Sequence, residues 1–454
     1  MGTTRVTSPR STAGQGSIGL LSCVAFAVGT MVGAGVFVLS GLAVQRAGPA
    51  AILSFVLAGV LVLLSALSFA VVASLAPAGG SGYAYVATAL GSRFGFLTSW
   101  AFWLGGVIGV AFVLNAFGRY LHDFFVSALP ATAVAVAAVV LIAVLNLGPA
   151  SLIGRAETAL VAVKVAILAL LIVFALVHLD RAHLTPLTPH GTGAVVTTSG
   201  LLFIAYLGFN VVTNMAGDVD RPRRTIPLAI LISMAIVALI YVGVVVALLA
   251  GGISSYDEAS VGTAAQHLIG NWGGVLIPIG ALISTLSAAN ANMLGSSEIM
   301  VRLAADRQVP TVAGRLWHGH PAVSVLAGAV VSVVLLFTGG IEAIVALGNV
   351  AAIVAMVLVN AAAVRAQRDP HAGGVRLPAG PLLPALGLLA ALVQLVFIGW
   401  WQTLFGLVLV AAGLGLHALR GRHHPGHHAT ITEHLRRNAG PAGRALRRRT
   451  TREV

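Results

Sequence analysis

The sequence predicts an all-α membrane protein with about twelve transmembrane helices. Of its 454 residues, 58% are hydrophobic and only 9% are charged, and the mean hydropathy is +0.97. Soluble domains contain about 25% charged residues, so this composition excludes a soluble protein. Because about 20 apolar residues span a bilayer as a helix, the spans can be delimited one by one. They are residues 18–41, 50–74, 97–121, 131–149, 158–179, 196–216, 227–250, 273–298, 322–338, 341–364, 380–398 and 401–419.

The spans divide the chain into three parts. Residues 1–15 are a polar cytoplasmic segment, residues 16–420 form the transmembrane domain, and residues 421–454 form a basic cytoplasmic tail. The tail either contacts anionic lipid or is a disordered segment. The first 15 residues are polar and no small-residue cleavage site follows at the expected distance, so we expect the first span to be retained.

The arginines predict how the spans are oriented. With the N-terminus placed in the cytoplasm, all but three of the 25 arginines fall on the cytoplasmic side. Cytoplasmic loops of membrane proteins are rich in Lys and Arg, so we expect a multi-pass protein of the cell membrane with both termini in the cytoplasm. The three arginines expected outside are Arg46, Arg119 and Arg181.

Two spans contain glycine at corresponding positions. The first contains VGTMVGAGVFVLSG (28–41), and the sixth contains AYLGFN (205–210). Such paired interruptions are typical of the inverted repeats of transporters. A broken membrane helix presents carbonyl groups at one end and N–H groups at the other, which suit an ammonium and a carboxylate. Alternatively these glycines are helix-packing positions, since Gly29 and Gly33 form a G-x-x-x-G motif.

Four segments together have the pattern of a known family. They are VGTMVGAGVFVLSG (28–41), LSALSFAVVASLAPAGGSGYAYVATALGSRFGFLTSW (64–100), DVDRPRRTIPLAI (218–230) and STLSAANANMLGSSEIMVRLAADRQVP (284–310). With them, the chain from about residue 15 to 365 resembles transporters of the amino acid–polyamine–organocation (APC) superfamily. The resemblance implies a LeuT-type five-plus-five inverted repeat with broken helices 1 and 6. The repeats would cover about 18–179 and 196–364, and two extra helices would cover about 380–419.

The resemblance also implies amino-acid transport by alternating access. The substrate would contact the two breaks, largely through backbone atoms. The residues expected to bind it are Val32, Gly33, Ala34, Gly35, Ile204, Ala205, Tyr206, Leu207 and Gly208. Tyr206 and Phe209 flank the second break, where they either gate the site or pack as ordinary aromatic side chains.

Lys164 is the only lysine of the chain, and it lies nine residues after Arg155 within the fifth span. At 1.5 Å per residue this is roughly 14 Å into the membrane, close to the midplane. A charge at this depth indicates a functional residue. A buried lysine can release its proton whereas an arginine stays charged, and the resemblance implies a match to the fifth-helix lysine of some proton-coupled or sodium-independent relatives. We therefore expect Lys164 to couple transport to protons, with a purely structural role as the alternative.

Other polar residues in the spans are weaker candidates. Glu298 either forms an i, i+4 salt bridge with Arg302 or takes part in gating, and Glu342 is expected to be solvated. Asn210 stands where some relatives of cationic specificity have a carboxylate, which argues against a cationic substrate. Hydroxyl groups of the eighth span could also approach the site, namely those of Ser284, Thr285 and Ser287.

These observations favour a secondary transporter of neutral amino acids, coupled to protons. A cationic amino acid or polyamine antiporter is the alternative, and a non-transporting membrane sensor or subunit is a different class. An enzyme is not expected, because no metal-ligand cluster and no nucleophile–base pair stand out at membrane depth. The expected partners are an amino acid, protons and the lipid bilayer, with no cofactor, no metal and no nucleic acid.

Overall fold

The computed structural model describes residues 18–75, 82–147, 153–214, 219–317, 320–372 and 374–421. The regular elements in these ranges are all helices. The N-terminal segment 1–15 and the basic tail beyond residue 421 lie outside the described residues. The same is true of Pro77, Gly79 and Gly80 in the second of the family-like segments.

All twelve predicted spans coincide with helices. The first consists of α1 (Leu20–Met31), η1 (Gly35–Leu39) and α2 (Ser40–Ala47), and the sixth consists of α8 (Gly191–Leu202), η5 (Phe203–Tyr206) and α9 (Asn210–Asn214). The other ten are α3 (Ala51–Leu75), α5 (Ser92–Phe124), α6 (Ala131–Asn146), α7 (Ile153–His178), α10 (Pro222–Ala250), α12 (Asn271–Ala305), α13 (Ala322–Leu336), α14 (Ile341–Arg368), α15 (Leu382–Phe397) and α16 (Trp400–Gly421). The first and sixth spans are thus broken, as predicted for helices 1 and 6.

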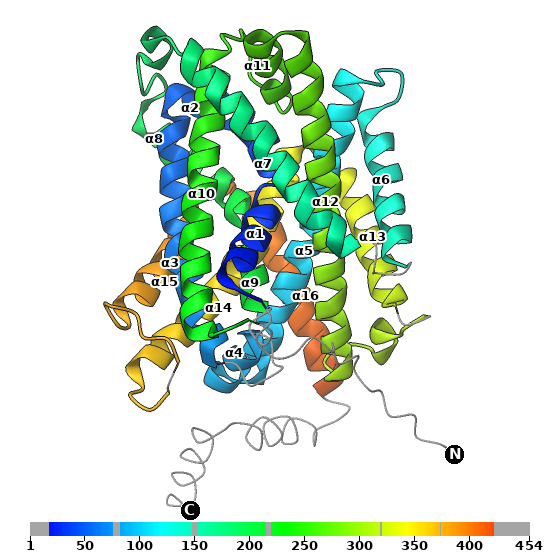
Figure 1. The fold of residues 1–454 in the computed structure, drawn as a ribbon. Coiled ribbons are helices and arrows are strands. Elements are labelled where there is room, and N and C mark those ends of the chain that lie inside the picture. Colours follow the sequence, from blue (N-terminus) through cyan, green and yellow to red (C-terminus); the bar gives the residue numbers. More distant parts are fainter. Residues whose placement is uncertain are drawn as a thin grey trace, which may run out of the picture.

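Two short helices lie at opposite ends of the bundle. Figure 1 shows α4 (Gly82–Leu90) at the bottom and α11 (Ser260–Ile269) at the top. These two ends are called the α4 end and the α11 end below.

The outer surface of the bundle suits a lipid environment. Within the described part of the chain, six helical stretches are long and apolar enough to cross a membrane, and six shorter helices are also apolar. Large apolar side chains point outward and are more than half exposed, such as Leu239 (73%), Val330 (63%) and Val396 (77%). The chain is therefore an all-α, multi-pass membrane protein.

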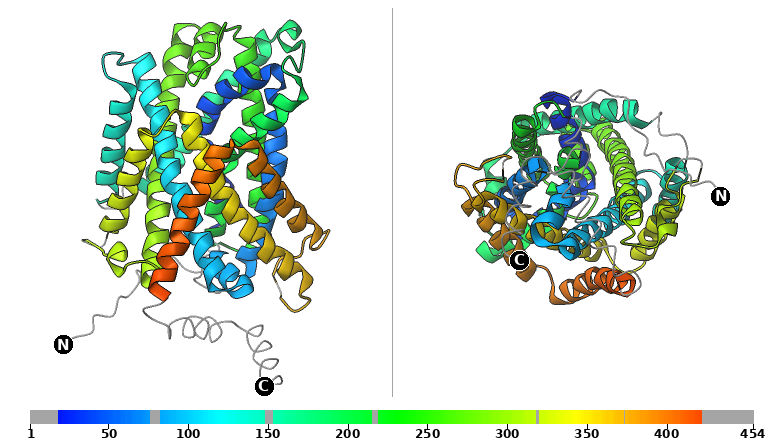
Figure 2. Two further views of the ribbon diagram at one scale, coloured as in Figure 1. Left: turned by 180° about the vertical axis from the view of Figure 1, so that it is seen from behind. Right: turned by 90° about the horizontal axis from the view of Figure 1, so that it is seen from below.

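The broken spans lie inside the bundle. α1 packs against α7, α9, α10 and α12, and it crosses the middle of the molecule in Figure 1. α5, the helix of the third span, packs against α12 and α14. The view from below in Figure 2 shows α16 at the periphery, outside the helices that surround α1. This arrangement encloses both breaks with helices of the two predicted repeats.

Two ion pairs join elements near the α11 end. Arg46 of α2 lies 2.5 Å from Glu342 of α14, and Arg119 of α5 lies 2.5 Å from Glu258, which precedes α11. The prediction that Glu342 is simply solvated is therefore incomplete, since its side chain is 46% exposed but also paired. Arg46 could not be identified as its partner because the two residues are far apart in the sequence.

Candidate substrate site

The first break frees backbone carbonyl groups at the end of α1. A helix leaves its last carbonyls without intrahelical partners, and a break inside a membrane must satisfy them with other groups. Three side chains from three helices do so. Lys164 donates to Gly29 O at 2.5 Å, Tyr241 donates to Met31 O at 2.8 Å, and Ser284 donates to Val32 O at 2.9 Å.

Beyond the break the chain starts a new helix at Ala34 and Gly35. No side chain caps the N-terminus of η1, and its first turn contains no acidic residue. The first N–H groups of a helix lack intrahelical partners and bear partial positive charge. This end of the break is therefore suited to a carboxylate group.

The second break begins after η5. Leu207 is extended, with φ −70° and ψ 142°, and α9 starts at Asn210. Gly208 between them has a φ of 131°, which other residues rarely adopt. A Cβ atom on Gly208 would also lie 3.0 Å from the backbone nitrogen of Met31. Glycine is needed here for both reasons, and it brings the second break against the first.

The two breaks are in direct contact. A Cβ atom added to Gly35 would lie 3.0 Å from Cβ of Ala205, so this glycine permits the close approach. Tyr241 of α10 also links the breaks, because its hydroxyl group lies 2.8 Å from Met31 O and 2.7 Å from Ala205 O. The hydroxyl has one proton, which these two carbonyl groups share.

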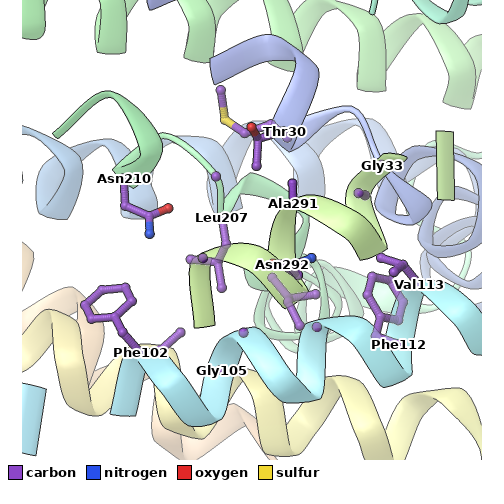
Figure 3. Close-up of a pocket in the computed structure, with 18 of the residues that line it drawn as sticks. Thr30, Gly33, Phe102, Gly105, Phe112, Val113, Leu207, Asn210, Ala291 and Asn292 are labelled. Atoms are coloured by element: carbon purple, nitrogen blue, oxygen red, sulfur yellow. The ribbon is translucent and has the colours of Figure 1, made fainter. Parts of the chain in front are cut away.

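A cavity of about 160 Å³ adjoins both breaks. Its walls come from the breaks and from α5, α12 and α14 (Figure 3). None of the side chains in this described lining is charged. The polar side chains that line it are those of Thr30, Asn210, Asn292 and Ser296.

Most of the predicted binding residues line this cavity. They are Gly33, Ala34, Gly35, Ile204, Ala205, Leu207 and Gly208, and the predicted gate residue Phe209 also lines it. Val32 and Tyr206 lie outside the lining. The Val32 side chain is buried, and the Tyr206 hydroxyl donates to Phe55 O of α3 at 2.9 Å. Phe209 also packs edge-on against Phe69, with ring centroids 5.2 Å apart.

Lys164 is completely buried beside α1, as its position in the fifth span predicts. It does not line the cavity, and it reaches the first break through Gly29 O. Gly29 and Gly33 also make packing contacts, since added Cβ atoms would meet Val161 of α7 and Ala288 of α12. The break and the packing interpretations of these glycines are therefore both correct.

The remaining polar candidates differ in their placement. Glu298 is exposed on α12 and does not line the cavity, and no ion pair joins it to Arg302 within the described chain. The expected salt bridge is therefore not formed. Of the hydroxyl candidates, Ser284 reaches the first break, whereas Thr285 bonds to carbonyl groups of its own helix.

Sequence reasoning missed Tyr241 and the walls formed by α5 and α12. Tyr241 is the only tyrosine in a seventh span whose only other polar residue is Ser233, and this could have marked it. Gly105, Gly106 and Gly109 of α5 line the cavity, and their spacing places them near one face of the third span. Asn292 of α12 also lines the cavity, but nothing in the surrounding sequence distinguishes it from the nearby Asn290.

The chain is similar to known membrane transporters. The model of the amino acid permease family matches residues 23–411. The inner membrane transport protein YbaT of Escherichia coli is 27% identical over 88% of this chain and 94% of its own length. The branched-chain amino acid permease BcaP of Bacillus subtilis is 27% identical over 90% of this chain and 93% of its own.

A plant relative shows the breadth of the group. Cationic amino acid transporter 5 of Arabidopsis thaliana is 28% identical over 71% of this chain and 60% of its own length. These relatives are transporters, which confirms that the chain is not an enzyme, and the resemblance to the APC superfamily is likewise confirmed. The chain belongs to the amino acid permease family.

Proposed function

We propose that this amino acid transporter carries neutral amino acids and couples their movement to protons. The main support for a neutral substrate is the described lining of the cavity, in which no side chain is charged. A charged substrate side chain would lose its hydration there without gaining an ionic partner, which costs several kcal/mol. A neutral side chain avoids this cost.

The charges common to all amino acids would be matched by the backbone at the breaks. The uncapped N-terminus at Ala34 and Gly35 is suited to the α-carboxylate. Carbonyl groups at the second break, near Ile204 and Ala205, are suited to the α-ammonium. The substrate would thus contact both broken helices, and its binding would favour states in which the breaks are in contact.

Lys164 would provide the coupling to protons. As an ammonium it makes a charge-assisted hydrogen bond to Gly29 O, where the negative end of the α1 dipole adds to the attraction. Loss of its proton would remove the charge and weaken the hold on α1. The protonation state of Lys164 would thereby bias the position of the first broken helix without contact with the substrate.

The substrate and the driving force can be tested in proteoliposomes. Uptake of labelled neutral, cationic and acidic amino acids is measured with and without an inward proton gradient, and with a protonophore as a control. We expect uptake of neutral amino acids that the gradient stimulates. Uptake restricted to cationic amino acids would refute the assignment of a neutral substrate. Uptake at the same rate with and without the proton gradient would refute proton coupling.

The role of Lys164 needs its own variants. Lys164→Met removes the charge, and Lys164→Arg keeps a charge that does not titrate in this range. In both variants, uptake should no longer respond to the proton gradient. The two variants can still differ in the rate at which they exchange amino acids without a gradient. Uptake by Lys164→Met that equals the wild type across a pH series would contradict the proposal.

A cationic amino acid or polyamine exchanger is the competing assignment, and one relative is named for cationic amino acids. Asn210 lines the cavity as an uncharged amide, and no carboxylate joins it in the described lining. In a competition assay, excess arginine or a polyamine should therefore leave the uptake of a neutral amino acid unchanged.

We also propose that the α4 end faces the cytoplasm in the cell membrane, with repeats over about 18–179 and 196–364. The distribution of arginines supports this orientation. It can be tested by replacing Cys23 and introducing a cysteine at Thr188 or at His371, both of which are exposed. An impermeant maleimide on intact cells should label the first position and not the second.

A further inference from the structure

Three glycines of α5 line the cavity, but they differ in what surrounds them. A Cβ atom on Gly106 would lie 3.0 Å from Cβ of Ser296, and one on Gly109 would lie 3.2 Å from the amide of Asn292. These two glycines allow α5 and α12 to pack closely. A Cβ atom on Gly105 would have one heavy atom within 4 Å, which is Cβ of Ala351 at 4.0 Å. Helix packing therefore does not require a glycine at this position.

Gly105 faces the space next to the second break. Figure 3 shows it on α5, with Leu207 and Asn292 on other walls of the same cavity. Gly105 is half-buried, so an added side chain would extend into a confined part of the cavity. Leu207 belongs to the break that we propose binds the substrate backbone. Space beside Leu207 is within reach of a side chain on a substrate held there.

We propose that Gly105 determines the largest amino-acid side chain that the transporter accepts. This inference rests on the proposed function. Because Gly105 has no side chain, the space between α5 and the second break is free for the side chain of the substrate. A larger residue would fill this volume without disturbing the contacts between α5 and α12, which Gly106 and Gly109 make.

The expected effect depends on substrate size. One methylene group more or less in an apolar pocket changes discrimination by roughly 10- to 200-fold. Gly105→Ala should therefore lower the transport efficiency for leucine and phenylalanine by about tenfold or more, relative to alanine. Gly105→Val should extend the loss to valine, while alanine and glycine are still transported.

Two other glycines provide matched controls. Gly193 lies in α8, outside the cavity lining, and has no heavy atom within 4 Å of its Cβ position. Gly415 lies in α16, outside the cavity lining, and its Cβ position is also open. Gly193→Ala and Gly415→Ala add the same methyl group to a membrane helix away from the cavity and should keep the wild-type order of substrates.

The experiment is uptake of labelled glycine, alanine, valine, leucine and phenylalanine by the full chain in proteoliposomes, with thermal stability measured in parallel. A loss that increases with substrate size in Gly105→Ala and Gly105→Val, and not in the controls, supports the inference. An unchanged order of substrates overturns it, as does an equal loss for all five amino acids. If Gly105→Val does not fold, the alanine variant alone decides. Failure of the wild type to transport any amino acid would instead refute the proposed function.

Discussion

Replacing Tyr241 with phenylalanine tests whether one hydroxyl group holds the two helix breaks together. The change removes the proton shared by Met31 O and Ala205 O. It keeps the aromatic ring, which packs against Phe55 and Tyr206 with centroids 5.2 and 5.1 Å apart. Any effect therefore comes from the lost hydrogen bonds and not from lost packing.

The magnitude follows from what each carbonyl group retains. Met31 O still accepts a hydrogen bond from Gly33 N at 2.8 Å, whereas Ala205 O loses a donor. A buried acceptor left unsatisfied costs about 1–3 kcal/mol. If this cost falls on the state in which the breaks are in contact, substrate affinity decreases by roughly 5- to 150-fold.

Uptake kinetics of Tyr241→Phe in proteoliposomes provide the measurement, and KM should increase more than the maximal rate decreases. Tyr206→Phe is the matched control, because its hydroxyl bonds to Phe55 O inside the regular helix α3. Thermal unfolding of both variants separates loss of stability from loss of binding. Equal KM values for the two variants would refute the idea that Tyr241 links the breaks.

Three further experiments test the contacts around the breaks and the α11 end. Gly35→Val should abolish transport but not membrane insertion, because its Cβ atom would lie 3.0 Å from that of Ala205. Normal uptake by this variant would show that the glycines of residues 28–41 serve only helix packing. Gly208→Ala should lower thermal stability by about 1–3 kcal/mol, because the residue keeps a φ of 131°, and an unchanged melting temperature would contradict this. Double-mutant analysis of Arg46→Gln and Glu342→Gln should give a coupling of at most about 1 kcal/mol, since both side chains are over one-third exposed. A larger coupling in thermal unfolding would show that the pair is more than a surface contact.

The sequence was sufficient to predict the spans and the positions of both breaks. Apolar length sets the spans, and glycine between apolar residues indicated where the helices are interrupted, so both features depend on local sequence. The depth of Lys164 was also predictable, because it depends only on the rise of a helix from the membrane surface. Its burial in the structure agrees with this estimate.

The contacts between distant helices were not predictable in the same way. Tyr241 lies 210 residues from Met31 and 36 residues from Ala205, and no local pattern indicates that it reaches both. The role of Gly105 likewise depends on the empty space opposite α5, which is a property of the packed bundle. Residues whose importance comes from such distant neighbours can be recognised only once the fold is known.

The anchoring of α1 has a consequence for the energetics of the transport cycle. The end of α1 is bonded to helices of the fifth, seventh and eighth spans through Lys164, Tyr241 and Ser284. At a net value of about 1 kcal/mol for each of the two neutral hydrogen bonds and about 1.5 kcal/mol for the charge-assisted one, moving α1 away from all three costs roughly 3.5 kcal/mol. Only roughly one molecule in 400 would then have α1 displaced at rest. With the role proposed for Lys164, loss of its proton would need to supply only this difference to make the displaced state common.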